Sequence, residues 1–455
     1  MLSRLLPRAL RCLGVSVALA LAPEAILLAC SDNVPELSGT DTRFPLVYGD
    51  RPTVEQLSAL GRKMFFDTSL SVSGKQACSS CHDPEHAYGP PDNRVVQPGG
   101  PLLDRFGFRN APSLSYLHSP IAFTEHFYEA EPAGGKDDQG PTGGRTWDGR
   151  VNTGHDQALM PLMDSNEMAN ASRQELFERL QKSDYAKAFR EAVSPPGEDV
   201  FADPESALVW MTVAIEVFEQ SAEFHPFTSK FDAYLKDQVE LSPAEQRGLS
   251  LFNDMKKGNC ASCHPSMHKS PANHLPLFTD FGYVALAVPR NRALPANQDP
   301  AFFDLGLCGP LRTDLKDRVE YCGMFRTPSL RNVARRKNYF HNGSMHSLRD
   351  VIEFYATRDT KRAQWYRDST GRRITTFDDM PASYWINVNV DAPFKPRANG
   401  QPRLDSREID DIVAFLATLS DGYSNPSVPA RGRAAAAATA TATSRSKSRV
   451  SAGPS

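Results

Sequence analysis

The sequence predicts an all-α chain with two helical domains in tandem, joined by long irregular loops. A five-residue motif with two cysteines and a histidine occurs twice, at residues 78–82 and 260–264. Each copy follows a segment whose apolar residues have helical spacing. No alternation of polar and apolar residues is long enough to predict a substantial sheet. Proline is frequent, at 35 residues, which is typical of long connections between helices.

The N-terminal segment has the pattern of an export signal. Arg4, Arg8 and Arg11 precede an apolar run at residues 12–22, which is the usual order of charge and hydrophobicity in such signals. The run is too short to span a bilayer permanently. Residues 26–30 are similar to a bacterial lipoprotein cleavage box with Cys30 as the lipidated residue. Cleavage after Ala22 without a lipid is the alternative. We therefore assign residues 1–30 to an export signal.

The rest of the chain divides by composition. Residues 425–455 contain no acidic and no aromatic side chain, and such a segment buries too little apolar surface to fold, so we predict a disordered tail. Residues 44–240 and 241–424 then form the two domains, one for each motif. The formal net charge of −3 argues against a nucleic-acid partner.

The repeated motif is C-x-x-C-H, the attachment motif of c-type haem. Its cysteines and histidines are Cys78, Cys81 and His82 in the first copy and Cys260, Cys263 and His264 in the second. The thiols add to the vinyl groups of the porphyrin, and the adjacent histidine reaches the iron. A redox dithiol or half of a zinc site would not need a histidine directly after the second cysteine, twice. The sequence predicts two covalently bound haems, attached after export.

Each motif is preceded by a capped helix. Thr53 and Gln56 have the spacing of a capping box, and apolar residues at helical spacing follow them. Ser242 and Glu245 have the same spacing, with Pro243 at the first helical position. A third helix, predicted at residues 405–419, closes the second domain. The chain therefore looks like two copies of one small helical unit.

Several further segments resemble the bacterial dihaem cytochrome c peroxidase and MauG family. They are the W-D-G-R segment at residues 147–150, Gln157 and Glu167 at successive ten-residue intervals from Trp147, and residues 325–333, 339–343 and 351–355. The resemblance extends from Thr53 to Gly422. It implies a peroxide-reacting haem in the first domain, an electron-transfer haem in the second, and a homodimer, which is common among relatives.

Three residues are candidates for catalytic roles. Glu167 is the candidate acid/base that moves a proton between the two peroxide oxygens, because a carboxyl facing a haem pocket is desolvated and its pKa rises. Gln157 can position peroxide or water through hydrogen bonds. Trp147 is the candidate electron relay between the haems. The alternatives are an exposed glutamate, a surface amide and a core tryptophan.

The first haem departs from the best-known peroxidases of the family. They place a capping histidine in the loop after the first motif, whereas residues 93–100 contain none. We expect an open iron site there, as in MauG-like members. His86 is expected at the haem edge, and His118 and His126 are the remaining candidates for a distant cap.

The resemblance also suggests metal ligands at and near the second haem. Tyr355 occupies the position where those peroxidases have a methionine ligand and MauG-like proteins a tyrosine, with Met345 and Met324 as rival ligands. Asn110 matches a calcium-binding asparagine, and the backbone carbonyls of Arg336 and Asn338 would complete the calcium site.

Cys308 and Cys322 remain after the leader and both motifs are accounted for. In an oxidising compartment such a pair most simply forms a disulfide, which would close a loop of about fifteen residues and contribute about 3 kcal/mol. Free buried thiols are the alternative.

The sequence thus predicts a periplasmic enzyme that reduces hydrogen peroxide with electrons from a small donor, such as a c-type cytochrome or a cupredoxin. Electrons would enter at the haem of His264, pass Trp147 and reach the haem of His82. One alternative is a MauG-like oxidase that modifies a partner protein. The other is an electron carrier without enzymatic activity, against which Glu167 and Gln157 argue because a carrier needs no proton shuttle.

Overall fold

The helices that precede the two motifs begin at the predicted caps. The computed structural model describes residues 52–117, 120–130, 136–267 and 275–424. Helix α1 (Val54–Phe65) starts after Thr53, and α7 (Pro243–Asn253) starts after Ser242, each with both hydrogen bonds of a capping box. The predicted closing helix is α10 (Ser406–Ala417), which has a capping box at Asp405. These local predictions are confirmed.

The other helices have between 4 and 16 residues, and they alternate with irregular segments. They are α2 (Gly154–Met163), α3 (Arg173–Lys182), α4 (Ala186–Val193), α5 (Pro204–Glu219), α6 (Lys230–Leu235), α8 (Leu348–Thr357) and α9 (Arg362–Trp365). Short 3₁₀ helices occur at Thr68–Leu70, Cys78–Ser80, Pro84–His86, Val200–Ala202, Cys260–Ser262, Pro295–Gln298, Val319–Tyr321, Val333–Arg335 and Ala382–Asn387.

The strands are few and short, so the described chain is helix-rich, although not free of sheet. Strands β1 (Tyr128–Ala130) and β2 (Lys136–Asp138) pair antiparallel, with Tyr128 opposite Asp138. Strands β3 (Tyr283–Ala285) and β4 (Met324–Arg326) do the same, with Tyr283 opposite Arg326. Three-residue ladders are too short to leave an alternating pattern in the sequence.

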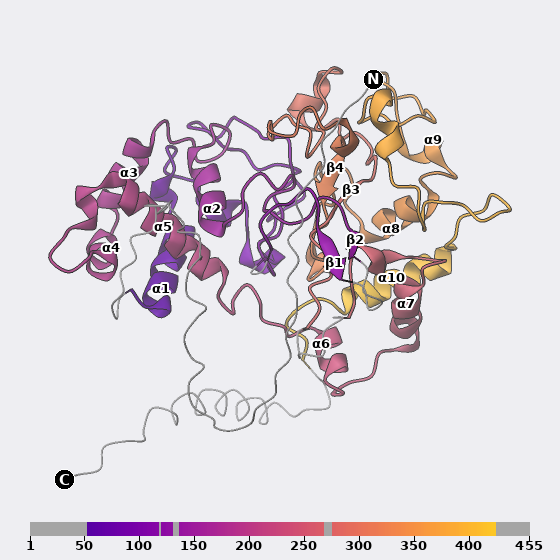
Figure 1. Cartoon of the computed structure of the whole chain (residues 1–455), viewed down its shortest axis with the longest axis horizontal. Helices are drawn as coiled ribbons and strands as arrows, with labels where there is room; N and C mark the ends of the chain where they lie inside the picture. The colour runs from indigo at the N-terminus through magenta and orange to yellow at the C-terminus, as the bar shows by residue number, and fades with distance from the viewer. Residues whose placement is uncertain (1–51, 118–119, 131–135, 268–274, 425–455) are drawn as a thin grey trace, which may run out of the picture. The chain divides into compact units, whose positions relative to one another are not determined.

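The first half of the described chain (up to residue 240) and the second half (from residue 241) each contain one close helix crossing. Helix α1 packs against α5, and α7 packs against α10 (Figure 1). A Cβ atom on Gly61 would lie 1.8 Å from the carbonyl oxygen of Ala214, and one on Gly248 would lie 2.0 Å from that of Asp411. The two glycines hold the same place relative to the motif helices, each four residues before a fully buried phenylalanine. The internal repeat seen in the sequence is therefore also a repeat of packing.

Each crossing is surrounded by its own hydrophobic core. The first core is largely aliphatic and includes Leu57 and Ile215. The second contains a cluster of phenylalanines, with Phe231, Phe252 and Phe415 almost fully buried. Phe231 lies in α6, so this helix packs in the second core although it precedes the second motif.

Ion pairs join the two halves. The described residues all belong to one compact unit, Phe44–Ser455. The Arg109 guanidinium pairs with Asp148 at 2.7 Å and with Asp304 at 2.6 Å. All three side chains are buried, so the loss of one would leave an uncompensated charge in the interior. Arg109 and Asp148 precede the second motif and Asp304 follows it, which fixes how the halves meet.

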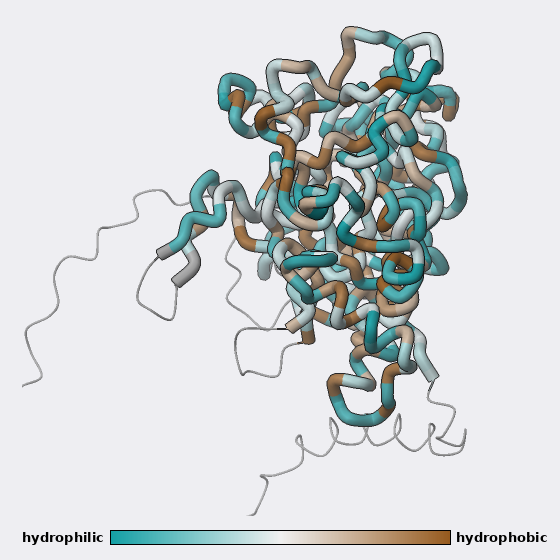
Figure 2. Tube along the Cα trace, turned by 90° about the vertical axis from the view of Figure 1, so that its right-hand side faces the viewer, coloured by the Kyte–Doolittle hydropathy of each residue, from teal (hydrophilic) through white to brown (hydrophobic). Residues whose placement is uncertain are grey.

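Of the remaining predictions about the chain, the structure tests the disulfide. Cys308 and Cys322 form the predicted disulfide, and the four motif cysteines are free. No helix among the described residues is long and apolar enough to cross a membrane, and hydrophobic stretches along the trace are short (Figure 2). The predicted export signal, with Cys30, and the predicted disordered tail lie outside the described residues.

Candidate haem sites

The first C-x-x-C-H motif lies in the wall of an internal cavity. Cys78, Cys81 and His82 all line it. His82 is held through Nδ1, which lies 3.0 Å from the carbonyl oxygen of Tyr88, so Nε2 is left for a metal. Burial lowers the pKa of His82 to about 4. The imidazole is therefore neutral, as an iron ligand must be.

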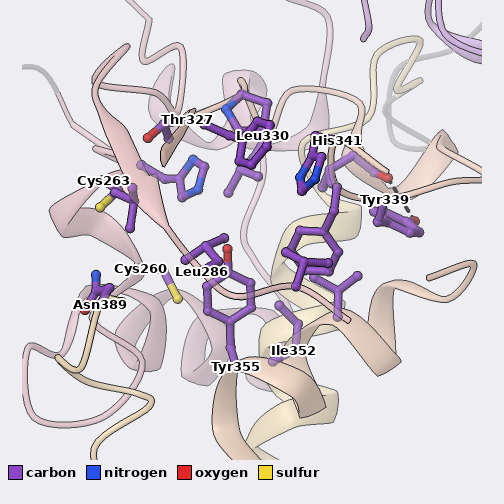
Figure 3. A pocket seen from close by; sticks show the side chains of 18 of the residues that line it. Cys260, Cys263, Leu286, Thr327, Leu330, Tyr339, His341, Ile352, Tyr355 and Asn389 are labelled. Carbon is purple, nitrogen blue, oxygen red and sulfur yellow. Dashed lines mark hydrogen bonds between the residues drawn. The ribbon is translucent and has the colours of Figure 1, made fainter. Parts of the chain in front are cut away.

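The second motif repeats this geometry in a second cavity. Cys260, Cys263 and His264 line it, and His264 Nδ1 lies 2.8 Å from the carbonyl oxygen of Phe278. Burial lowers the pKa of His264 to about 4 as well. Figure 3 shows the two cysteine side chains together on one side of this cavity. Each cavity thus offers two thiols and one oriented imidazole, the donor set of a c-type haem.

Unpaired arginine nitrogens in the cavity walls also fit a haem. Arg145 Nε, Arg326 Nη1 and Arg336 Nε are buried and have no hydrogen-bond partner among the described residues. Arg145 lines the first cavity, Arg336 the second, and Arg326 both. A buried guanidinium nitrogen without an acceptor is costly. Haem carries two propionate carboxylates, which would supply such acceptors. The residues present therefore fit the cofactor.

Glu167 and Gln157 lie in the wall of the first cavity, together with His82. Gln157 extends from α2, and Glu167 follows that helix in the turn at residues 164–167. Glu167 lines the cavity, and its side chain is exposed in the absence of a bound group. Desolvation of the carboxyl by the surrounding protein, together with the negative charge of Asp164, raises the pKa of Glu167 to about 7. The carboxyl can therefore both accept and donate a proton near neutral pH.

The backbone of Glu167 is held from the loop that follows the first motif. The Gly100 N–H donates to the Glu167 carbonyl at 2.8 Å. A Cβ atom on Gly99 would lie 2.0 Å from the carbonyl oxygen of Asn166, so only glycine permits this approach. The loop that follows the first motif, in which the resemblance led us to look for a capping histidine, thus holds the backbone of Glu167.

A second carboxyl in this cavity was not predicted from the sequence. Glu219 at the end of α5 lines the cavity, and burial raises its pKa to about 8, against the opposing effect of Arg145. Glu219 is one of several acidic residues on α5, and no local pattern distinguishes it from the others. Only the packing of α5 against the cavity reveals it.

Trp147 lies between the two cavities and lines both of them. Its indole N–H donates to the carbonyl oxygen of Asn110 at 2.8 Å, and its own carbonyl accepts from the Arg326 N–H at 2.9 Å. His341 meets the indole edge to face, at 6.5 Å between ring centroids, and stacks on Phe325 at 3.6 Å. His341 lies in a family-like segment, but the sequence assigned it no role.

At the second haem site, the structure separates the rival ligands. Tyr355 lines the cavity, and Figure 3 shows it pointing from α8 into the space between Cys260 and His341. Neither Met345 nor Met324 is among the residues that line the cavity. Burial raises the pKa of the Tyr355 hydroxyl, so ionisation of the phenol would need a compensating charge such as ferric iron.

No predicted capping histidine reaches the first cavity within the described part of the chain, where His82 is the one histidine in the wall. His86 was expected at the haem edge. It pairs with Asp83 at 2.8 Å and does not line the cavity. His126 pairs with Asp138 at 2.7 Å, and its side chain is exposed. His118 lies outside the described residues.

Asn110 and the Asn338 carbonyl, two of the three predicted calcium ligands, lie near one another at the junction of the halves. The Asn110 amide nitrogen lies 3.3 Å from the Asn338 carbonyl oxygen and 3.2 Å from that of Phe340. Asn110 Oδ1 is buried, without a hydrogen-bond partner in the described structure. The carbonyl oxygen of Arg336 accepts from the Tyr339 hydroxyl. A cation could satisfy Asn110 Oδ1, whereas the Arg336 guanidinium nearby would oppose its charge.

Comparisons with known proteins agree with this donor set. Residues 55–240 match the family model for di-haem cytochrome c peroxidase. The chain is 30% identical over 382 residues to the methylamine utilization protein MauG of Paracoccus denitrificans, covering 83% of this chain and 91% of that protein. It is 30% identical over 305 residues to the cytochrome c551 peroxidase of Pseudomonas aeruginosa, covering 66% and 72%.

A solved structure is also similar. The crystal structure of the diheme peroxidase BthA from Burkholderia thailandensis matches with a TM-score of 0.70 and 39% sequence identity. The match covers 82% of this chain and 87% of that one.

Proposed function

Because the chain belongs to the di-haem cytochrome c peroxidase and MauG family of haem oxidoreductases, we propose that it carries two c-type haems and reduces hydrogen peroxide to water. One observation carries this proposal. Glu167 and Gln157 lie in the same cavity wall as the motif of His82. A carboxyl with a pKa near 7 has no use in an electron carrier, whereas cleavage of peroxide needs one.

The residues of the first cavity have different roles in peroxide reduction. A haem bound there supplies an iron that binds peroxide and exchanges electrons. Glu167 takes the proton from the inner peroxide oxygen and delivers it to the outer oxygen, which leaves as water. Gln157 holds the peroxide through its amide. One peroxide consumes two electrons and two protons and yields two waters.

Trp147 relays electrons between the two cavities. A small donor, either a c-type cytochrome or a cupredoxin, delivers them at the second haem site. The indole lines both cavities and is held by the Asn110 carbonyl, so no long step through aliphatic packing is needed. Its ring contact with His341 extends this aromatic path.

A MauG-like oxidase is the second candidate, and the position of Tyr355 favours it. A tyrosine ligand from the wall of the second cavity, which Met380 also lines but Met345 and Met324 do not, would stabilise ferric iron over ferrous. Such a site is less suited to accepting electrons from a donor protein and more suited to holding oxidising equivalents. The pair of sites would then oxidise a partner protein.

The location and the calcium site belong to the same proposal. A periplasmic location, with or without a lipid at Cys30, is supported by the export pattern of residues 1–30. It is also supported by the disulfide between Cys308 and Cys322, which an oxidising compartment preserves. Calcium is supported by the unpaired Oδ1 of Asn110. A homodimer stays a prediction from the resemblance.

A steady-state assay tests the function. The holoprotein is mixed with peroxide and a reduced small c-type cytochrome, and both peroxide loss and donor oxidation are followed. A peroxidase oxidises two molecules of donor for each peroxide. Peroxide loss without donor oxidation would contradict this function and favour the oxidase. The absence of both would contradict either enzyme.

A further inference from the structure

The disulfide-closed loop from Cys308 to Cys322 lies in the second half by sequence, but it packs on the first half. Leu307, Leu315 and Tyr321 form a small buried cluster with Tyr283, and Phe123 from the first half packs against it. The base of the loop is hydrogen bonded, because Leu307 N–H donates to Met324 O and Gly323 N–H donates to Leu305 O.

Two arginines fasten the loop to the first half. Arg312 donates to the Asp148 carbonyl at 2.9 Å, and its guanidinium lies 3.8 Å from the centroid of the Phe123 ring. Arg318 forms an ion pair with Glu125. The disulfide joins the two ends of the loop, and Arg312 and Arg318 attach the residues between them to the first half. The loop is therefore a fixed part of the wall between the halves.

Leu311 lies between the disulfide and the Arg312 anchor and lines the first cavity. Among the described residues of the second half, only Leu311 and Arg326 belong to this lining. Arg326 is buried, whereas Leu311 is 41% exposed. A lining side chain that protein covers this incompletely is placed as a residue at an opening of the cavity would be, and Glu167 and Gln157 belong to the same lining.

We propose that Leu311 is the residue that sets the size of molecule admitted to the first haem site. The inference rests on the proposed function, since it assumes an open peroxide site in that cavity. A leucine held by a disulfide and by Arg312 narrows the opening without polar contacts to the entering molecule. Hydrogen peroxide passes it, and bulkier alkyl hydroperoxides are excluded by shape.

Ligand binding to the ferric holoprotein tests this without turnover. Stopped-flow absorbance gives the second-order rate constants for cyanide, a small ligand, and imidazole, a larger one, from the loss of the high-spin ferric signal. In Leu311→Ala the ratio of the imidazole to the cyanide rate constant should rise about tenfold, a typical effect of steric exclusion at an apolar site. Leu311→Trp should lower the same ratio.

Val319→Ala is the matched control. Val319 is an exposed aliphatic residue of the same loop that does not line the cavity, so its ratio should stay at the wild-type value. An unchanged ratio in Leu311→Ala, with wild-type thermal stability, would overturn the proposal, and so would an equal rise in Val319→Ala. Turnover with tert-butyl hydroperoxide should follow the imidazole rates.

The same measurements separate this inference from its premise. If the wild-type protein binds cyanide but consumes no peroxide, the proposed function fails, and the ligand ratio still decides the role of Leu311. If it binds neither ligand, the cavity is closed to small molecules and the role of Leu311 is overturned.

Discussion

Replacing Glu167 with glutamine tests the proton shuttle most directly. The substitution keeps the shape of the side chain and removes the proton-accepting carboxylate. General acid–base groups contribute about 10²–10⁴-fold to rate, so kcat/KM for peroxide should fall by about that factor. Haem content and the ferric spectrum should be retained, because no motif residue is altered.

The pH dependence of kcat/KM for peroxide gives a second expected magnitude, which is more narrowly defined. The shuttle begins as a base, so its ionised form is active, and a pKa raised to about 7 means that activity is lost as pH falls through 7. At pH 5.5 only about 3% of such a carboxyl is ionised, so wild-type kcat/KM should be roughly thirtyfold below its plateau. The Glu167→Gln profile should lack this acidic limb.

Two control variants complete the assay, which is initial peroxide consumption from pH 5 to 9. Glu178→Gln alters an exposed glutamate of α3 and should match the wild type at every pH. Glu219→Gln removes the other carboxyl with a raised pKa in the cavity and should retain the limb near pH 7. The reasoning is refuted if Glu167→Gln keeps both the wild-type kcat/KM and its loss below pH 7. If only Glu219→Gln removes this loss of activity at acidic pH, Glu219 rather than Glu167 is the acid/base residue.

Four further predictions concern the other site residues. Trp147→Phe should leave the first haem reactive toward peroxide but slow the response of the second in rapid mixing, and unchanged rates at both haems would remove the relay. Tyr355→Phe should change the low-spin spectrum of the second haem, because the phenol oxygen is its proposed ligand; an unchanged spectrum that Met345→Leu alters would identify the methionine instead. The fully oxidised protein should show a high-spin ferric signal and react with peroxide at a rate that pre-reduction does not affect, since no described histidine other than His82 lines the first cavity; two low-spin haems in the resting spectrum would contradict this. Chelation with EGTA should slow electron transfer between the haems and added calcium should restore it, because Asn110 both holds the indole of Trp147 and carries the unpaired amide oxygen; insensitivity to EGTA would remove calcium from the site.

Much of the local structure could be predicted from the sequence because its signals are short-range. The capping box at Thr53 and the helix start at Ser242 are confirmed, since a cap depends on side chains three residues apart. The disulfide followed from counting cysteines. The short strands were missed, because their pairing joins segments such as β3 and β4 that are far apart in sequence.

Some features of the candidate site could likewise be predicted from the sequence, and others became visible only in the fold. The two attachment motifs are contiguous, so the sequence alone indicates two thiols and one imidazole at each site. Glu167 and Gln157 were identified through family spacing, and their presence in one cavity became visible only in the fold. His86 shows the limit of proximity in sequence, because a residue four positions from His82 pairs with Asp83 and leaves the cavity wall.

What the sequence determined by itself is therefore the chemistry: the haem attachment motifs, the capped helices that precede them and the family to which they point. What the tertiary structure decided is which distant groups line the same cavity: Glu219 with Glu167, Trp147 with both cavities, and Leu311 with the first cavity. The physical reason is range. Caps and attachment motifs act within one turn of backbone, whereas burial, raised pKa values and cavity walls arise from packing between segments that are far apart in the sequence, on which no local pattern reports.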